Sequence, residues 1–187
     1  MRCEEGDCYE VGVCLVVVKK CGGNMAILNH FMNSYKLDVI DVSAAFFYCA
    51  KHYPYSTPIT HLKLQKLMYY AQGFSMARNN IKIFDECFEA WDHGPVCRRL
   101  YDEYKGMSYY EIPDEMVKGD PHNIMKHCIV WNIIMEVWTV FGKMSGKQLE
   151  MMTHRELPWI SAMKKGRNTT FSDQEMKSFF YDVLYCD

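Results

Sequence analysis

The chain has 187 residues, long enough for one compact domain that buries a sizeable core. Hydrophobic residues make up 49% of it and charged residues 24%, a composition typical of a globular protein and not of a disordered one. The formal net charge of -2 offers no basic excess for phosphate backbones, and no apolar run reaches the roughly 18 residues that a membrane span needs. These values argue against non-specific nucleic-acid binding and against a membrane protein, so we expect a cytoplasmic protein.

Four of the nine cysteines lie near the N-terminus: Cys3, Cys8, Cys14 and Cys21. Four, five and six residues separate them, whereas the cysteine pairs of structural zinc sites are usually separated by two to four. We therefore expect residues 1–24 to be a poorly ordered, cysteine-rich extension without a cofactor, followed by the domain proper over residues 25–187. A zinc site at the four cysteines is one alternative, and translation starting at Met25 is another.

The spacing of apolar residues predicts two helices in the first half of the domain. The first covers residues 38–52, with Asp38 or Asp41 at its start. The second covers residues 61–79, where apolar side chains recur at i, i+3, i+4 and i+7 behind Thr60, a good N-cap residue. Each helix should turn its apolar stripe towards a core.

A short extended segment and a third helix are predicted next. Residues 86–91 alternate polar and apolar side chains, which is typical of a strand. Pro95 suits the first position of a helix, because its missing N–H has no partner to lose there. Residues 106–121 combine glycine, proline and charge without a period, so they indicate a connecting loop.

The C-terminal part of the chain is predicted to be helical throughout. Residues 123–141 carry apolar side chains on nearly every face, which indicates the central buried helix, with Gly142 as its stop. Three pairs then fit the capping-box pattern: Ser145 with Gln148, Thr153 with Glu156, and Ser172 with Glu175. The expected fold is mainly α, a compact helical domain with one short strand or hairpin.

Lys63, Lys66 and Tyr70 share one face of the predicted helix over residues 61–79, because they are spaced at i, i+3 and i+7. Periodicity alone favours a solvated lysine face on an amphipathic helix. A cationic recognition surface is the functional alternative.

Two further segments combine polar and aromatic residues. Residues 89–96 place Trp91 and His93 just before a predicted helix start, and residues 153–159 place His154 beside a predicted cap. A structural turn is the simpler interpretation of each segment. The chain has no GxSxG elbow, no Walker-type loop, no GxGxxG, no HExxH and no pair of histidines at i and i+4, so the sequence does not favour an enzyme.

The three segments together resemble one known family. ITHLKLQKLMYYAQG over residues 59–73, EAWDHGPV over residues 89–96, and Thr153-His154 followed by Pro158-Trp159 resemble the Panacea family of SocA-like antitoxins and phage-associated GepA proteins. The resemblance implies a mostly helical, non-enzymatic antitoxin that neutralises a cognate toxin by binding it. A proteolytic adaptor that delivers a toxin or a host protein to a ClpXP-type protease is the alternative within the same resemblance.

The family's shared polar positions, carried over by this resemblance, are expected to gather around one groove and to contact the partner: Lys63, Gln65, Lys66, Tyr70, Trp91, His93, Gly94, Pro95, Thr153, His154 and Trp159. Whether they hold the fold or bind the partner is left open at this point. A hypothesis from another class is an enzyme or small-ligand module that uses His93, His154 and Lys66. A phage-borne inhibitor of a host protein is the third.

Overall fold

The computed structural model describes residues 33–53, 57–107 and 110–185, which all belong to one compact unit of residues 31–187. Its elements are β1 (Asn33–Ser34), α1 (Val39–His52), α2 (His61–Asn79), β2 (Ile81–Lys82), β3 (Phe88–Trp91), β4 (Gly94–Cys97), α3 (Arg98–Tyr104), the 3-10 turns η1 (Lys105–Met107) and η2 (Asp114–Met116), α4 (Pro121–Met125), α5 (Cys128–Phe141), α6 (Gly146–Thr153), α7 (Leu157–Lys165) and α8 (Asp173–Tyr185). The predicted extension over residues 1–24, with its four cysteines, lies outside the described residues.

The mainly α fold expected from the sequence is confirmed. Two small sheets accompany the helices: β1 pairs in parallel with β2, and β3 pairs antiparallel with β4. The two predicted helices in the first half also form where expected. Asp38 caps α1 by accepting from the N–H of Ile40, and Thr60 caps α2 by accepting from the N–H of Lys63. Of the helices that the structure describes, none has the length and apolar character needed to cross a membrane.

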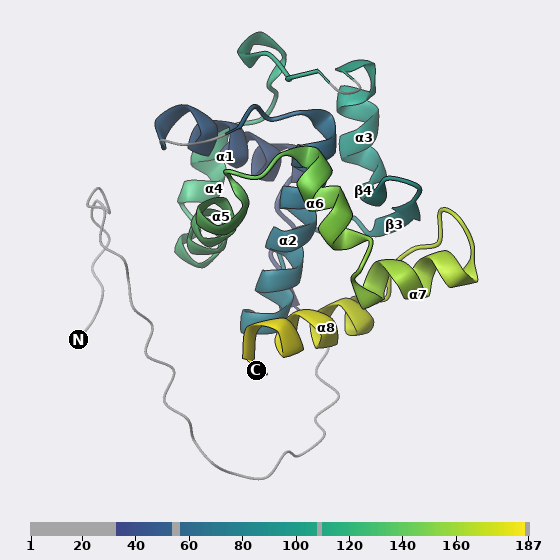
Figure 1. The fold of residues 1–187 in the computed structure, drawn as a ribbon. Helices are drawn as coiled ribbons and strands as arrows, with labels where there is room; N and C mark the ends of the chain where they lie inside the picture. Colours follow the sequence, from purple (N-terminus) through teal and green to yellow (C-terminus); the bar gives the residue numbers. More distant parts are fainter. Residues whose placement is uncertain (1–32, 54–56, 108–109, 186–187) are drawn as a thin grey trace, which may run out of the picture. The chain divides into compact units, whose positions relative to one another are not determined.

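Helix α2 lies at the centre of the domain, with other elements packed around it (Figure 1). Helices α1, α5, α6 and α8 and strand β4 all contact it. As a result, 16 of its 19 residues are buried, including polar ones. A helix surrounded in this way cannot keep a solvated face, so each of its polar side chains needs a partner inside the protein.

The helix predicted over residues 123–141 forms from Cys128 and ends at Gly142 as expected, but it is not the central buried helix. The segment forms two helices, because Asp120 caps α4 with Pro121 in its first turn and a second helix, α5, starts at Cys128. Helix α5 buries only six of its 14 residues. Apolar side chains on its other faces stay in solvent, with Val140 54% exposed. The apolar residues on all faces of this segment therefore did not identify the central helix, which is α2.

A hairpin replaces the helix start predicted at Pro95. Trp91 pairs with Gly94, and Pro95 lies opposite Ala90 within β4, so that helix α3 begins only at Arg98. Gly94 makes the turn possible, because its φ of 95° lies in the left-handed region that other residues avoid. The strand predicted over residues 86–91 is confirmed for its last four residues, where β3 forms.

The three predicted capping boxes have different outcomes. The pair Ser145–Gln148 is confirmed, with both reciprocal hydrogen bonds present at the start of α6. Ser172 accepts from the N–H of Glu175, which is one half of the expected box. The capping box predicted for Thr153 and Glu156 is wrong. Thr153 is the buried last residue of α6, and its hydroxyl donates to the carbonyl of Glu150.

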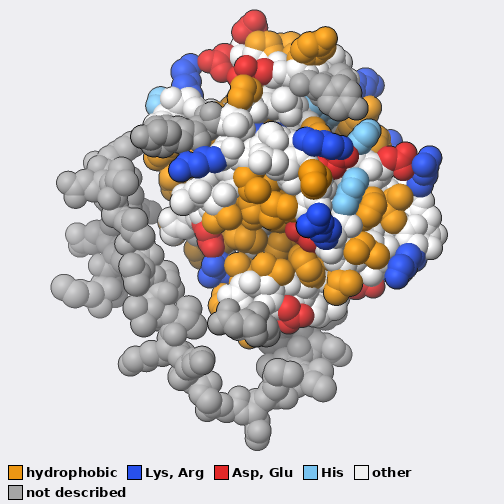
Figure 2. Space-filling view, in the orientation of Figure 1, with side chains coloured by type: hydrophobic (Ala, Val, Ile, Leu, Met, Phe, Trp, Pro, Cys, Tyr) orange, Lys and Arg blue, Asp and Glu red, His pale blue; other side chains and the backbone are white. Residues whose placement is uncertain are grey.

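Helices α5, α6 and α8 each pack against α2, and hydrophobic side chains gather on the surface between them (Figure 2). Helix α8 approaches α2 at Gly73. A Cβ added at Gly73 of α2 would lie 2.1 Å from the ring of Phe180. The missing side chain of Gly73 therefore sets how near α8 can come to α2.

We predict that Gly73→Ala destabilises the protein by about 1–3 kcal/mol, because the methyl group must displace the Phe180 ring and overpacking costs more than the alanine gains as a helix former. Urea denaturation followed by circular dichroism measures this change. Gly106→Ala is the matched control, since a Cβ there meets nothing within 4 Å. Equal stabilities for the two variants would contradict the packing argument.

Candidate functional site

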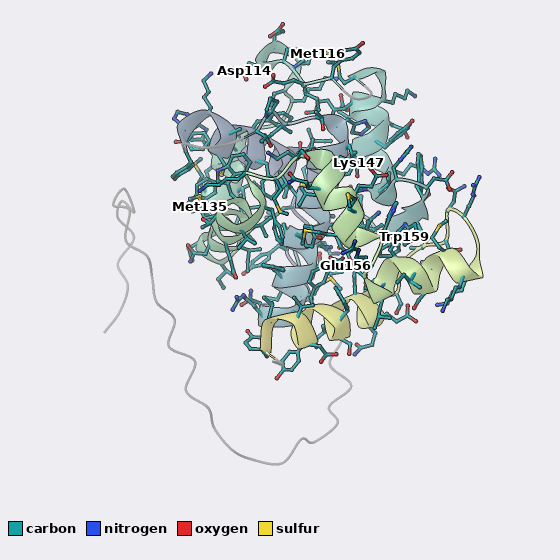
Figure 3. All side chains as sticks on the ribbon, viewed as in Figure 1. Asp114, Met116, Met135, Lys147, Glu156 and Trp159 are labelled. Carbon is teal, nitrogen blue, oxygen red and sulfur yellow. The ribbon has the colours of Figure 1, made fainter. Side chains whose placement is uncertain are left out.

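Three segments that are distant in sequence meet around the middle of α2. Helix α6 and strand β4 pack on α2, and α7 packs on β3. Lys147, Glu156 and Trp159 follow one another along α6 and into α7 (Figure 3). The structure therefore brings together the three segments that carry the predicted motifs. The polar residues at their junction, Lys66, Tyr70, Glu150, Thr153 and Glu156, are called the polar cluster below.

Lys66 is the centre of the polar cluster and has no exposed surface. Its Nζ donates to the carbonyl oxygen of Pro95 at 2.9 Å. A Cβ on Gly94 would lie 2.8 Å from this Nζ and 2.8 Å from the hydroxyl oxygen of Thr153, so the glycine leaves the space that the amine occupies. Burial lowers the pKa of Lys66 to about 7, although Glu150 and Glu156 favour its charged form.

Glu150 connects the polar cluster to the surface. One carboxylate oxygen lies 2.9 Å from Nδ1 of His93 and the other accepts from Nζ of Lys147 at 2.8 Å. Burial raises the pKa of Glu150, but the hydrogen bonds from Lys147 and His93 outweigh it and hold the pKa below the usual value. These residues border an open hollow of about 360 Å³ that also includes Thr60 and Ser145.

Glu156 forms the inner part of the polar cluster. Its Oε1 accepts from the hydroxyl of Tyr70 at 2.8 Å, whereas its buried Oε2 and the buried hydroxyl of Tyr69 make no hydrogen bond within the described residues. Burial raises the pKa of Glu156, and Tyr70, Tyr69 and Lys66 oppose that shift. Burial next to this carboxylate also raises the pKa of both tyrosines.

Lys63 and Gln65 hold loops in place and do not form a solvated face. Nζ of Lys63 donates to the carbonyl and hydroxyl of Thr57 and to the carbonyl of Gly142, and burial lowers its pKa to about 8. The amide of Gln65 accepts from the N–H of Cys97 and donates to its carbonyl. Since both side chains and Lys66 are buried, the prediction of a solvated lysine face is wrong.

Gln72 repeats the role of Gln65 two turns further along α2. Its side chain accepts from the N–H of Ile83 and donates to the carbonyl of Phe84. Sequence reasoning missed it. Gln65 and Gln72 are seven residues apart, so the sequence does show that they lie on the same face of the helix. It does not show their partners, because these are backbone groups of other segments.

Two tryptophans and two histidines lie at the outer edge of the site. Nε1 of Trp159 donates to the carbonyl of Trp91 at 3.0 Å, and the ring of His154 stacks on Trp159 with centroids 4.2 Å apart. Burial lowers the pKa of His154, whose buried Nε2 makes no hydrogen bond within the described residues. His93 is open to solvent, with 61% of its side chain exposed.

The eleven predicted site residues thus fall into two groups. Seven are buried: Lys63, Gln65, Lys66, Tyr70, Gly94, Pro95 and Thr153. Four are at least partly open to solvent: Trp91, His93, His154 and Trp159. The buried group binds other parts of the same domain. Contact of any of the eleven with a partner stays a prediction.

Each residue of the alternative catalytic set, His93, His154 and Lys66, is engaged with another group. His93 pairs with Glu150, His154 stacks on Trp159, and Lys66 has no surface that a substrate could touch. Across residues 33–53, 57–107 and 110–185, no group of three or more histidine, cysteine or acidic side chains could hold a metal ion.

Fold and site define a mainly helical domain in which three motif segments are joined by a buried polar cluster. The chain belongs to the family of SocA-like antitoxins with a Panacea domain. The model of this family matches residues 64–160, which are more than half of the chain. Antitoxin SocA of Caulobacter vibrioides (strain NA1000 / CB15N) is 31% identical over 111 residues, which cover 54% of this chain and 58% of that protein. The chain therefore aligns with less than two thirds of this relative. No solved structure matches it at a significant level.

We predict that Lys66→Met removes a pH dependence of stability. The pKa of Lys66 is about 7 in the folded protein, against 10.5 for an unperturbed lysine, so between these values only the unfolded chain holds the proton. The free energy of unfolding of the wild type should therefore rise with pH relative to the variant, by up to about 5 kcal/mol. Urea denaturation at a series of pH values measures this difference.

Lys164→Met is the control for that experiment, because it removes an exposed lysine from the same fold. Its stability should run parallel to that of the wild type over the whole range. A parallel course for Lys66→Met as well would show that the Lys66 amine is not held in the core.

Proposed function

We propose that this protein is the antitoxin of a toxin–antitoxin pair, and that it neutralises a protein toxin in the cytoplasm by binding it, without catalysing a reaction. The observation that carries the proposal is the family match over residues 64–160, because this range includes most of α2, the hairpin and the turn from α6 into α7. The relative that aligns with the chain is named an antitoxin, which supports the same conclusion.

The outer edge of the site supports a contact surface for the toxin. His93 and Lys147 border the hollow together with Glu150. Two residues before His93, the partly exposed Trp91 accepts a hydrogen bond at its carbonyl from Nε1 of the partly exposed Trp159. Tryptophan is enriched among residues that dominate binding energy at protein interfaces. A partner that covers this edge would therefore gain aromatic contact area beside charged groups already fixed by Glu150.

Co-expression tests the proposal. The reading frame adjacent to the gene is expressed from an inducible promoter, with and without this protein, and colony counts and affinity co-purification are recorded. We expect the neighbour to arrest growth alone, growth to recover when both are present, and the two proteins to purify together. A harmless neighbour, or growth arrest that persists beside folded protein, would refute the antitoxin function.

His93→Ala should weaken toxin binding by about tenfold, a typical loss for a contributing interface residue. His122→Ala is its matched control, because His122 is also an exposed histidine with Nδ1 2.9 Å from a carboxylate, that of Asp120. Isothermal titration calorimetry with the purified toxin compares the two variants. If both bind like the wild type, the toxin does not contact this edge.

The same co-expression strains separate direct neutralisation from delivery to a protease. Direct binding leaves the toxin at an unchanged level in an inhibited complex. A toxin that disappears when this protein is present, and returns when ClpXP is deleted, would show an adaptor instead.

A further inference from the structure

The hollow beside Glu150 is bordered by three segments that are distant in sequence. It has a volume of about 360 Å³ and opens to solvent. Its lining comes from the start of α2, from the turn of the hairpin and from the first two turns of α6: Thr60, Leu62, His93, Ser145, Gly146, Lys147 and Glu150. A Cβ on Gly146 would lie 3.1 Å from the hydroxyl oxygen of Thr60 and 3.3 Å from Cβ of Leu62, so the starts of α2 and α6 lie close together. A group that enters the hollow therefore meets all three segments.

The acidic residue of the hollow is already bound on both carboxylate oxygens. One oxygen of Glu150 lies 2.9 Å from Nδ1 of His93, and the other accepts from Nζ of Lys147 at 2.8 Å. Only 3% of Glu150 is exposed. Since both oxygens are engaged and little of the residue reaches solvent, Glu150 offers a partner almost no acceptor surface.

The two hydroxyl groups at the hollow keep a hydrogen to donate. The hydroxyl oxygen of Ser145 accepts from the N–H of Gln148, and that of Thr60 accepts from the N–H of Lys63. Neither hydroxyl donates to another group within the described residues. A hydroxyl carries one O–H donor in addition to its lone pairs. Each of these two O–H groups can therefore point to a ligand in the hollow.

Lys147 also keeps hydrogens to donate. It lies near the start of α6 (Figure 3), and its side chain is 71% exposed. Its Nζ donates to Glu150 and to no second acceptor in the part of the chain that the structure describes. Because an ammonium group carries three N–H donors, two remain. A partner group that accepts several hydrogen bonds thus fits the hollow better than one that donates.

The charge of Glu150 does not exclude a second anionic group from the hollow. Hydrogen bonds from Lys147 and His93 stabilise its carboxylate, and the buried amine of Lys66 is attracted to it from inside the polar cluster. Its negative charge is therefore compensated by basic side chains from three elements. A carboxylate accepts hydrogen bonds without donating any, and its bond to an ammonium group is charge-assisted.

The size of the hollow fits a single side chain of a partner. Its volume is at the lower end of the range found for small-molecule sites, and it is open, whereas such sites enclose most of their ligand. Leu62 adds an apolar wall without hydrogen-bonding groups in its side chain. The methylene groups of an aspartate or glutamate can pack there while the carboxylate meets the donors.

We propose that the hollow binds one acidic side chain of the toxin, whose carboxylate accepts hydrogen bonds from Lys147, Ser145 and Thr60. The methylene part of the same side chain packs on Leu62. This inference rests on the proposed function, since the partner is the toxin found by co-expression. That toxin is the probe in each test, and the full chain is the binding protein.

Substitutions of Leu62 test the sign of the bound group. Leu62→Glu brings a carboxylate into the hollow, where it takes up the donors and repels the acidic side chain of the toxin. Leu62→Gln is the matched control, because it has the same size without the charge. We expect the Kd of Leu62→Glu to be at least about tenfold higher, with the difference shrinking as salt is raised. Equal affinities of the two folded variants, checked by circular dichroism, would overturn the proposal.

Lys147→Met tests the proposed cationic donor. Its Kd for the toxin should rise by about tenfold. Lys105→Met is the matched control, since Lys105 is also exposed and is also paired with an acidic residue three positions away, Asp102. Isothermal titration calorimetry should find the control unchanged. The same affinity for both variants would contradict a contact at Lys147.

A double-mutant cycle identifies the acidic side chain. Each acidic residue of the toxin is changed to its amide and measured against the wild type and against Lys147→Met. We expect one change that costs about tenfold in affinity against the wild type and little against Lys147→Met, because the two groups contact each other. A loss of stability alone would not produce this coupling. Additive losses for every acidic residue of the toxin would refute the proposed contact.

The outcomes keep the two proposals apart. If no toxin is found, the antitoxin function fails and this inference fails with it. If a toxin is found but neither Leu62→Glu nor Lys147→Met differs from its control, the antitoxin function stands and the inference is overturned. Loss of binding to inorganic phosphate or to duplex DNA by Lys147→Met, with unchanged toxin binding, would assign the hollow to a phosphate group and would also overturn it.

Discussion

The rest of the structure depends on keeping one lysine amine supplied with hydrogen-bond acceptors where water does not reach it. Lys66 lies in the middle of α2 without exposed surface, and taking its charge out of water is costly. The acceptor is the carbonyl of Pro95, and the favourable charges are those of Glu150 and Glu156. These three residues come from β4, from α6 and from the turn before α7. A single side chain therefore requires that all three motif segments be assembled at once.

The other polar side chains of α2 extend the same principle to the loops. Lys63 binds carbonyls of the segment before α2 and of Gly142 after α5, while Gln65 and Gln72 each pair with a peptide group of a neighbouring strand or loop. The described part of the domain forms two short sheets, which offer few backbone partners to such segments. Side-chain amides and amines of α2 form hydrogen bonds with these backbone groups instead. A helix rich in polar residues can therefore lie at the centre of the domain. This also explains why Lys63, Gln65 and Lys66, which were predicted as site residues, are found inside the domain.

Sequence reasoning placed the ends of α1 and α2 and the cap of α6 correctly because these features depend on neighbouring residues. Thr60 and Ser145 each act within one turn of helix. It failed where distant segments decide. The polar residues of α2 looked solvated because their partners come from the hairpin, from Thr57 and from Gly142. Pro95 looked like a helix start because the pairing of Gly94 with Trp91 is not encoded in local propensity. Of the polar cluster, Lys66, Tyr70 and Thr153 were among the predicted residues, although their burial was not predicted, whereas Glu150 and Glu156 were not predicted as site residues.

Tyr70 of α2 takes part in two kinds of contact. Its hydroxyl donates to Glu156 in the polar cluster, and its ring stacks on Phe141 of α5. One side chain therefore connects the carboxylate in the turn before α7 to the apolar packing between α2 and α5. Because the two contacts share this side chain, a substitution at Phe141 is expected to change the effect of a substitution at Glu156.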